Sequence, residues 1–350
     1  MMFRRLFGKF SKDMGFDLGT ANTLVYIKDK GIVINEPSIV AINNRTDQIL
    51  AVGEEARQMT GKAPSYISVV RPMVAGIISD FEVTEKMIKH FIDRVHKENF
   101  SLVPRPRVVI GIPLDVTEVE RKAVEDATMG AGASEVHLIE QPVAAAIGAR
   151  LPIQEPSGNM IIEFGGGTTE IAVISLGGVV TFTSIKNGGL KLDQDIIQYV
   201  RENFNLLLGE RTAEELKITL GNVHHDSELA DRKARGRDLY TGLPREITVN
   251  SGQVREAIIK NIRLLIESVR DTLEKTPPEL VAEIYQKGIV LSGGGALLRG
   301  LDKLIAGELK IPVHITDDPL TSVVRGTGMV LEDLDNLKDL LLPPANDIIG

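Results

Sequence analysis

The chain has 350 residues, a formal net charge of −8 at pH 7, 43% hydrophobic and 25% charged residues, and no cysteine. This composition indicates a folded globular protein, and the length indicates about two domains. It argues against bulk nucleic-acid binding, disulfides and thiolate metal sites, and suits the cytoplasm. No uninterrupted apolar stretch approaches the roughly 18 residues of a membrane-spanning helix. Basic residues interrupt the apolar start, so we expect no cleavable signal peptide.

Residues 1–12 combine an apolar stripe with a basic rim. Four apolar residues follow the i, i+3, i+4, i+7 spacing of one helix face: Phe3, Leu6, Phe7 and Phe10. The rim on the remaining faces consists of Arg4, Arg5, Lys9 and Lys12. This pattern predicts an amphipathic helix that lies in a membrane interface and meets anionic headgroups. The alternative is a terminal helix that docks on its own domain.

Two short segments, 146 positions apart, resemble each other: Asp17-Leu18-Gly19-Thr20-Ala21-Asn22-Thr23 and Glu163-Phe164-Gly165-Gly166-Gly167-Thr168-Thr169. Each has an acid, an apolar residue, a glycine and a threonine in the same order, and an alternating strand follows. Each predicts a β-hairpin whose tip exposes backbone N–H groups to phosphate. Together they predict a triphosphate and a hydrated Mg²⁺ in a cleft between two related domains.

Strand and helix patterns alternate along the rest of the chain. Arg107–Pro113 has the apolar pattern of a buried strand, and a capping box at Thr117 and Glu120 predicts a helix through Ala127. Glu140–Gly148 begins another helix, with a proline early in its first turn. This order predicts α/β domains with covered sheets.

A third glycine cluster follows a strand near the end of the chain. The strand over Gly288–Ser292 runs into Gly293-Gly294-Gly295-Ala296, and we expect a helix from Leu297 onward. An unhindered helix N-terminus attracts anions and admits a flat base, so this junction is a further candidate nucleotide contact. The P-loop pattern and its lysine are absent from the sequence, which excludes a Walker-type ATPase.

Three other clusters receive a structural interpretation. The polar stretch at His224-His225-Asp226 is interpreted as solvent-exposed and not as a metal site. The basic run Asp231–Arg237 is interpreted as a solvated helix end or loop. A helical spacing predicts core positions at Ile258, Ile259, Ile262, Leu265 and Ile266.

The motifs in combination resemble the MreB family of bacterial actin homologues, within the actin/Hsp70/sugar-kinase superfamily. The segments that carry the resemblance are Asp17–Thr23, Glu140–Gly148, Gly165–Glu170, Arg211–Glu214, Gly236–Leu239, Thr276–Leu280 and Gly293–Gly300. The similarity extends from about Asp13 to about Leu334. It implies an α/β, actin-like fold with a duplicated ribonuclease H-like core, in which each of two large subdomains carries a smaller inserted one. The expected boundaries are 13–34, 75–145 and 321–350 for subdomain IA, 35–74 for IB, 146–185 and 245–320 for IIA, and 186–244 for IIB.

The resemblance also implies site residues for ATP or ADP with Mg²⁺. The phosphates would contact Gly19, Thr20, Ala21, Asn22, Gly165, Gly166 and Gly167. Asp17 and Glu163 would hold the metal through water. The nucleoside would contact Ala213, Glu214, Glu215 and Lys217, and the adenine would border Gly293, Gly294, Gly295 and Ala296. Phe100 and Leu102 resemble the family's hydrophobic loop that enters the membrane beside the terminal helix.

Three positions depart from the family pattern. Glu163 stands where the family usually has Asp, which advances the carboxylate by roughly a bond length. Gln141 stands where the family has a glutamate thought to polarise the attacking water, and glutamine orients a water without taking its proton. Gly189-Leu190-Lys191 replaces Gly-Asp-Glu, so an acid near the ribose is missing. Gln141 and Thr168 would orient the water, and Glu140 could substitute only if the register slipped.

These features predict an ATP-binding, filament-forming cytoskeletal protein of bacterial cell-shape determination, with slow ATP hydrolysis as a timer of assembly. It would be cytoplasmic and peripheral on the inner face of the cell membrane. Its partners would be itself, the anionic membrane surface and, by resemblance, cell-wall elongation proteins. The alternative is a small-molecule kinase of the same superfamily, which would need a catalytic Asp for which the cleft has no clear candidate.

Overall fold

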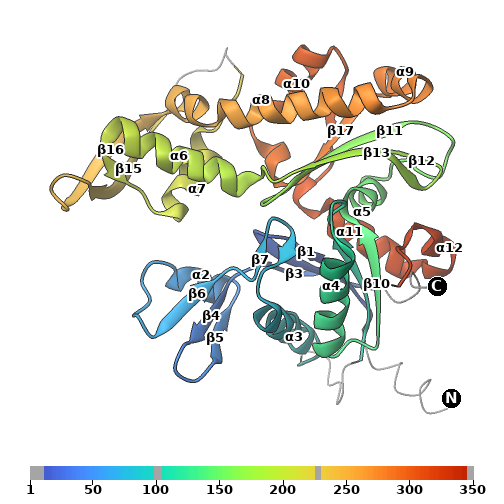
Figure 1. The fold of residues 1–350 in the computed structure, drawn as a ribbon, viewed down its shortest axis with the longest axis horizontal. Coiled ribbons are helices and arrows are strands. Elements are labelled where there is room, and N and C mark those ends of the chain that lie inside the picture. The colour runs from blue at the N-terminus through green and yellow to red at the C-terminus, as the bar shows by residue number, and fades with distance from the viewer. Residues whose placement is uncertain (1–11, 98–104, 225–229, 345–350) are drawn as a thin grey trace. The chain divides into compact units, whose positions relative to one another are not determined.

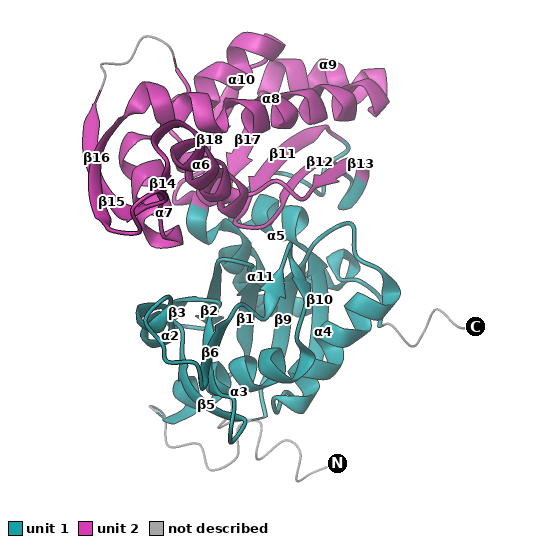
Figure 2. Cartoon of the chain, turned by 60° about the vertical axis from the view of Figure 1, so that its left-hand side comes forward, with its two compact units in different colours: residues 1–156, 174–179, 320–350 teal, residues 157–173, 180–319 magenta. Residues whose placement is uncertain are grey.

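The computed structural model describes residues 12–97, 105–224 and 230–344 (Figure 1). The chain divides into two compact units, which Figure 2 distinguishes by colour. Unit 1 comprises residues 1–156, 174–179 and 320–350, and unit 2 comprises residues 157–173 and 180–319. The finer division into four subdomains stays a prediction.

Unit 1 is built on a five-stranded sheet with the order β10-β9-β1-β2-β3. Its strands are β1 (Met14–Leu18), β2 (Asn22–Ile27), β3 (Gly31–Pro37), β9 (Arg107–Ile112) and β10 (Glu135–Glu140). The pairs β1–β2 and β2–β3 are antiparallel, whereas β9 pairs in parallel with both β1 and β10. The predicted hairpin after Asp17 and the predicted strand from Arg107 are therefore confirmed.

Helices pack on both faces of this sheet. Met14, Phe16 and Leu18 share a core with α3 (Phe81–Lys97) and α4 (Glu118–Gly130). Between them, Gly15 lies against Thr327 of α11 (Ser322–Glu332), because alternate residues of a strand point to opposite faces. The capping box that predicts α4 is present: Thr117 Oγ1 accepts a hydrogen bond from the Glu120 N–H, and the Glu120 carboxylate accepts one from the Thr117 N–H.

The helix predicted from Glu140 is α5 (Gln141–Gly148), which packs closely on α11. Both contact points are glycines: a Cβ at Gly148 would lie 2.0 Å from the Ser322 carbonyl oxygen. A Cβ at Gly326 would lie 1.8 Å from the Ala144 carbonyl oxygen. The two backbones are thus in direct contact along the middle and the end of α5.

The smaller elements of unit 1 have cores and contacts of their own. A three-stranded sheet, β5-β4-β6, packs with α2 around Ile39, Ala41, Ala51 and Ala56. The elements are β4 (Val40–Asn43), β5 (Gln48–Val52), α2 (Glu54–Met59), β6 (Ile67–Val70), β7 (Met73–Val74) and β8 (Ile77–Ile78). The chain ends with η2 (Pro319–Thr321), which begins in unit 2, α12 (Leu334–Leu337) and η3 (Lys338–Leu340).

A second five-stranded sheet, with the order β13-β12-β11-β17-β18, lies largely in unit 2. Its strands are β11 (Asn159–Phe164), β12 (Thr169–Ser175), β13 (Gly178–Ile185), β17 (Ile289–Ser292) and β18 (Val313–Ile315). The helices of unit 2 are α6 (Gly189–Phe204), α7 (Glu210–Leu220), α8 (Ser251–Lys275), α9 (Pro278–Lys287) and α10 (Leu301–Leu309). The predicted core positions of α8 are confirmed: Ile258, Ile262, Leu265 and Ile266 are buried and Ile259 is partly buried in the core of this unit.

Two expectations about unit 2 were wrong. The basic run after Asp231 is strand β15 (Asp231–Asp238), paired with β14 (Leu206–Leu207) and β16 (Pro244–Asn250). Cross-strand ion pairs offset part of its charge, since Lys233 and Arg235 both lie 2.8 Å from the Glu246 carboxylate. After β17 the chain forms a single 3₁₀ turn, η1 (Gly294–Leu297), and α10 begins only at Leu301. No helix among the described residues is long and apolar enough to cross a membrane.

Candidate functional site

The first predicted hairpin has its carbonyl groups bound on one side by Ser38. The Ser38 hydroxyl donates to the Gly19 carbonyl at 2.6 Å, and the Ser38 N–H donates to the Ala21 carbonyl at 2.9 Å. In a trans peptide the N–H points away from the preceding carbonyl, so the Thr20 N–H points away from Ser38. Within the described residues, the N–H groups of Gly19, Thr20 and Ala21 donate to no protein acceptor. The Thr20 N–H is therefore a free donor on the side opposite Ser38.

The side chains of this hairpin maintain its shape. Thr20 is buried, and its hydroxyl oxygen accepts a hydrogen bond from the Gly76 N–H at 2.8 Å. The Asn22 amide donates to Asn35 of β3 at 3.0 Å. A Cβ at Gly19 would lie 2.6 Å from the Asn22 carbonyl oxygen, so glycine is needed for the turn to close. The backbone of these residues, and not their side chains, is the part available to an anion.

Asp17 lies at the base of this hairpin without a charged partner. Within the described part of the chain, no donor or cation bonds its carboxylate. Burial raises the pKa of the Asp17 carboxyl to about 7, because desolvation disfavours the charged form. Asp17 aligns with Gly111 across the sheet, and by strand alternation it lies on the face that packs on α11.

Gln141 and Glu140 lie on opposite faces of the same sheet. The Gln141 Cγ is 3.3 Å from the position of a Cβ at Gly111, on the Asp17 face. Glu140 aligns instead with Ile112, on the α4 face. Burial raises the pKa of the Glu140 carboxyl, and the charge of Arg121 in α4 opposes that rise. The structure thus brings Gln141 and Asp17 to one edge and face and separates Glu140 from them.

The second hairpin repeats the arrangement of the first, with a helix in place of Ser38. The N–H groups of Gly189 and Leu190, at the start of α6, donate to the Gly165 and Gly166 carbonyls, each at 2.9 Å. The N–H groups of Gly166 and Gly167 consequently point away from α6. They and the Thr168 N–H donate to no protein acceptor in the described residues, whereas the Gly165 N–H closes the turn on the Thr168 carbonyl.

The third glycine cluster packs on the base of the second hairpin. Glu163 is buried and aligns with Ser292, and its carboxylate lies 2.6 Å from the position of a Cβ at Gly293. A Cβ at Gly295 would overlap the Phe164 ring at 2.1 Å. Packing alone therefore requires both glycines, and Ala296 is buried. Gly294 belongs to the 3₁₀ turn, so the helix N-terminus predicted here is absent.

The residues predicted for the nucleoside occupy different environments on α7. Ala213 is fully buried in the core of unit 2. Glu215 is half-exposed and pairs with Arg211 and Arg232. Lys217 Nζ donates to the Gly189 carbonyl and to the Asp193 carboxylate, both at 2.9 Å. Sequence reasoning missed Asp193 and Ser38, because neither belongs to a recognisable motif.

The predicted membrane residues lie outside the described residues: Phe3, Leu6, Phe7, Phe10, Phe100 and Leu102. The described residues that flank them are adjacent. The Lys12 N–H donates to His96 Nε2 at 3.3 Å, near the end of α3. Asp13 accepts from the Arg107 N–H at 3.0 Å and from its guanidinium at 2.6 Å. Residues 1–11 and 98–104 therefore join the described part of unit 1 at neighbouring points.

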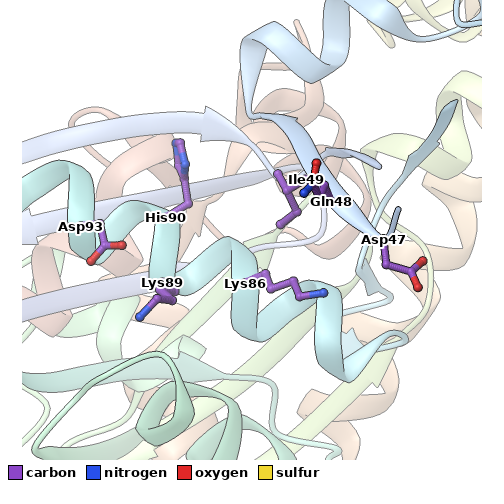
Figure 3. A pocket seen from close by; sticks show the side chains of 7 residues that line it. All are labelled: Asp47, Gln48, Ile49, Lys86, Lys89, His90 and Asp93. Atoms are coloured by element: carbon purple, nitrogen blue, oxygen red, sulfur yellow. The ribbon is translucent and has the colours of Figure 1, made fainter. Parts of the chain in front are cut away.

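An open groove of about 490 Å³ in unit 1 is separate from these residues (Figure 3). Charged side chains of α3 line it, including Lys86, Lys89 and Asp93, together with Asp47 and Gln48 of the small sheet. None of the predicted site residues lines it. The described residues contain no cluster of three or more metal-ligating side chains, and His225 and Asp226 lie outside them.

Comparison with known proteins identifies the family. Residues 11–339 match the family model described as MreB/Mbl protein. The cell shape-determining protein Mbl of Bacillus subtilis is 48% identical over 328 residues, covering 94% of this chain and 98% of that protein. The cell shape-determining protein MreB of Escherichia coli is 48% identical over 338 residues, covering 95% and 97%.

Solved structures show the same fold. MreB5 of Spiroplasma citri bound to ADP has 36% identity and a TM-score of 0.89, over 94% of this chain and 98% of that one. The MamK double helical filament, at 22% identity and a TM-score of 0.77, covers 92% and 99% and shares the fold alone. The chain therefore belongs to the MreB/Mbl family and has its actin-like fold.

Proposed function

We propose that this member of a cell shape-determining family binds ATP and ADP through its two hairpins and assembles into filaments. The observation that carries the proposal is the matched geometry of the hairpins. In each, carbonyls are bound on one side, by Ser38 or by the start of α6, and the tip N–H groups have no acceptor among the described residues. Such groups are the usual ligands of phosphate oxygens. Relatives support it, since Spiroplasma citri MreB5 has been solved with ADP and with AMPPNP.

Asp17 fits a hydrated divalent cation. A desolvated carboxylate that lacks a partner among the described residues gains most from a nearby cation, which would favour its ionised form. Glu163 would contribute from the second hairpin through water. Bound Mg²⁺ would neutralise charge on the β- and γ-phosphates.

Hydrolysis in this proposal is slow. Gln141 lies on the Asp17 face and would orient the attacking water together with Thr168, but an amide takes no proton from it. Slow turnover suits a timer of filament assembly. The kinase alternative is not favoured, because the chain belongs to a filament-forming family.

Attachment to the inner face of the membrane completes the proposal. Residues 1–12 carry the amphipathic pattern, and Phe100 and Leu102 carry the apolar loop pattern. The contacts of Lys12 with His96 and of Asp13 with Arg107 support a joint role of the two segments in membrane binding. They bring together the described residues that flank both segments. Cell-wall elongation proteins are the partners that the family implies.

The test is nucleotide binding by the full chain with Gly166→Val. Gly166 lacks the left-handed φ that only glycine adopts readily, and the new side chain would block the approach of phosphate. Calorimetry should detect ATP binding by the wild type and none by the variant. Gly307→Val is the matched control, since a Cβ there meets open space. Equal ATP affinity of Gly166→Val and wild type would refute the proposal.

A further inference from the structure

We infer that the ion pair of Asp193 and Lys217 is a positioning clamp that holds the second hairpin in its phosphate-binding geometry. The inference rests on the proposed nucleotide binding. It assigns Lys217 a role other than the nucleoside contact that the family resemblance implies, and it assigns a role to Asp193. Both residues lie in unit 2, on the neighbouring helices α6 and α7 (Figure 1).

The first step is that the start of α6 holds the hairpin. The α6 N-cap is Gly188, which offers no side-chain cap, and the first N–H groups of the helix donate to the Gly165 and Gly166 carbonyls instead. A Cβ at Gly188 would lie 2.5 Å from the Gly166 carbonyl group, so the two backbones are in contact. A displacement of this helix turn would therefore rotate the peptide groups whose N–H donors face the ligand.

The second step is that Lys217 holds the start of α6. Its ammonium donates to the Gly189 carbonyl and the Asp193 carboxylate, which lie one turn apart on α6. The pair is well shielded, with side-chain exposures of 18% for Lys217 and 7% for Asp193. Removal of one partner leaves a buried charge uncompensated, which is far more disruptive than the loss of an exposed pair.

The second hairpin and the clamp therefore have different roles within unit 2. The hairpin backbone contacts phosphate, and the clamp sets the orientation of that backbone without contacting the ligand. Loss of a positioning residue should weaken only the affinity for ligands that carry phosphate. Loss of a direct nucleoside contact should weaken the affinity for adenosine as well.

The experiment measures ATP, ADP and adenosine affinities of the full chain by calorimetry or competition. Asp193→Asn and Lys217→Met should each weaken ATP and ADP at least about tenfold, which corresponds to about 1.4 kcal/mol, and leave adenosine within about twofold. The double variant should be no weaker than either single variant, because both act through one interaction. Lys287→Met is the matched control: it breaks an exposed pair with Glu283 on α9 of the same unit and should change nothing.

A folding control accompanies these variants. Asp193→Leu combined with Lys217→Met replaces the pair with apolar side chains, which commonly preserves stability but removes the donor to the Gly189 carbonyl. With an unfolding midpoint near that of the wild type, it should show the same loss for ATP and ADP. Unchanged ATP affinity in Asp193→Asn, or an equal loss of adenosine affinity in Lys217→Met, would overturn the clamp. A wild-type chain that binds no ATP would instead overturn the proposed function.

Discussion

At the residue scale, the Asp17 carboxyl lowers the free energy of unfolding as pH rises, and the same carboxyl is the proposed metal contact. Its pKa rises from an ordinary value of 3.8 to about 7 on burial. Between these values the folded protein holds a proton that the unfolded chain has released. The free energy of unfolding of the nucleotide-free protein therefore decreases as pH rises through this range.

Asp17→Asn should remove this pH dependence. The variant cannot ionise, so its stability advantage over the wild type should grow between pH 5 and pH 8, by at most about 2 to 3 kcal/mol at about 1.4 kcal/mol per pH unit. Urea unfolding at both pH values, without nucleotide, measures the difference. Parallel stability curves for the two proteins would show that the Asp17 carboxyl is well solvated.

Gln141→Glu should accelerate ATP hydrolysis. A carboxylate beside the water provides the general base that the amide lacks, an effect of about 10²-fold or more where proton transfer matters. Phosphate release under single-turnover conditions is the measurement. Glu140→Gln is the matched control on the opposite face of the sheet, and it should leave the rate nearly unchanged. A slower Glu140→Gln variant, or an unaccelerated Gln141→Glu variant, would contradict the placement of Gln141 beside the water.

At the element scale, α5, the helix that begins with Gln141, packs closely on α11. Gly326→Ala should destabilise unit 1 by at least about 1 to 3 kcal/mol, because its Cβ would overlap the Ala144 carbonyl and force the helices apart. Gly307→Ala is the control, since that helical position is open and alanine is favoured there by up to about 1 kcal/mol. Urea unfolding compares the two. Equal stability of both variants would mean that α5 and α11 adjust freely.

At the scale of the whole molecule, membrane attachment depends on residues beyond the described core. Deletion of residues 1–12, or Phe7→Glu, should strongly reduce co-sedimentation with anionic liposomes under polymerising conditions. The apolar stripe contributes about 25 cal/mol per Å² of buried area, and each basic residue adds about 1 kcal/mol near an anionic surface. A filament multiplies this modest affinity.

Phe182→Glu is the control for charge alone, because Phe182 is an exposed phenylalanine of β13. Its binding should match that of the wild type, and added salt should weaken the binding of both. Equal binding by the truncated and full-length chains would show that the terminal stripe docks on its own domain.

The sequence by itself determined the elements whose causes are local. These elements depend on neighbouring residues, so the sequence pattern predicts them: the capping box at Thr117, the buried strand from Arg107 and the two acid–glycine hairpins. Their combination also identified the family. The basic strand β15 was missed because β16 supplies its pairing and its counter-charge.

Only the tertiary structure decided which groups of the hairpins are free. The Ser38 hydroxyl comes from 19 positions beyond Gly19, and the N–H groups that hold the second hairpin come from the start of α6. It also placed Gln141 with Asp17 and Glu140 on the other face, and it paired Lys217 with Asp193. The physical reason is that a backbone hydrogen bond or a buried ion pair between distant segments depends on how the chain packs, and such contacts leave no periodic pattern in the sequence.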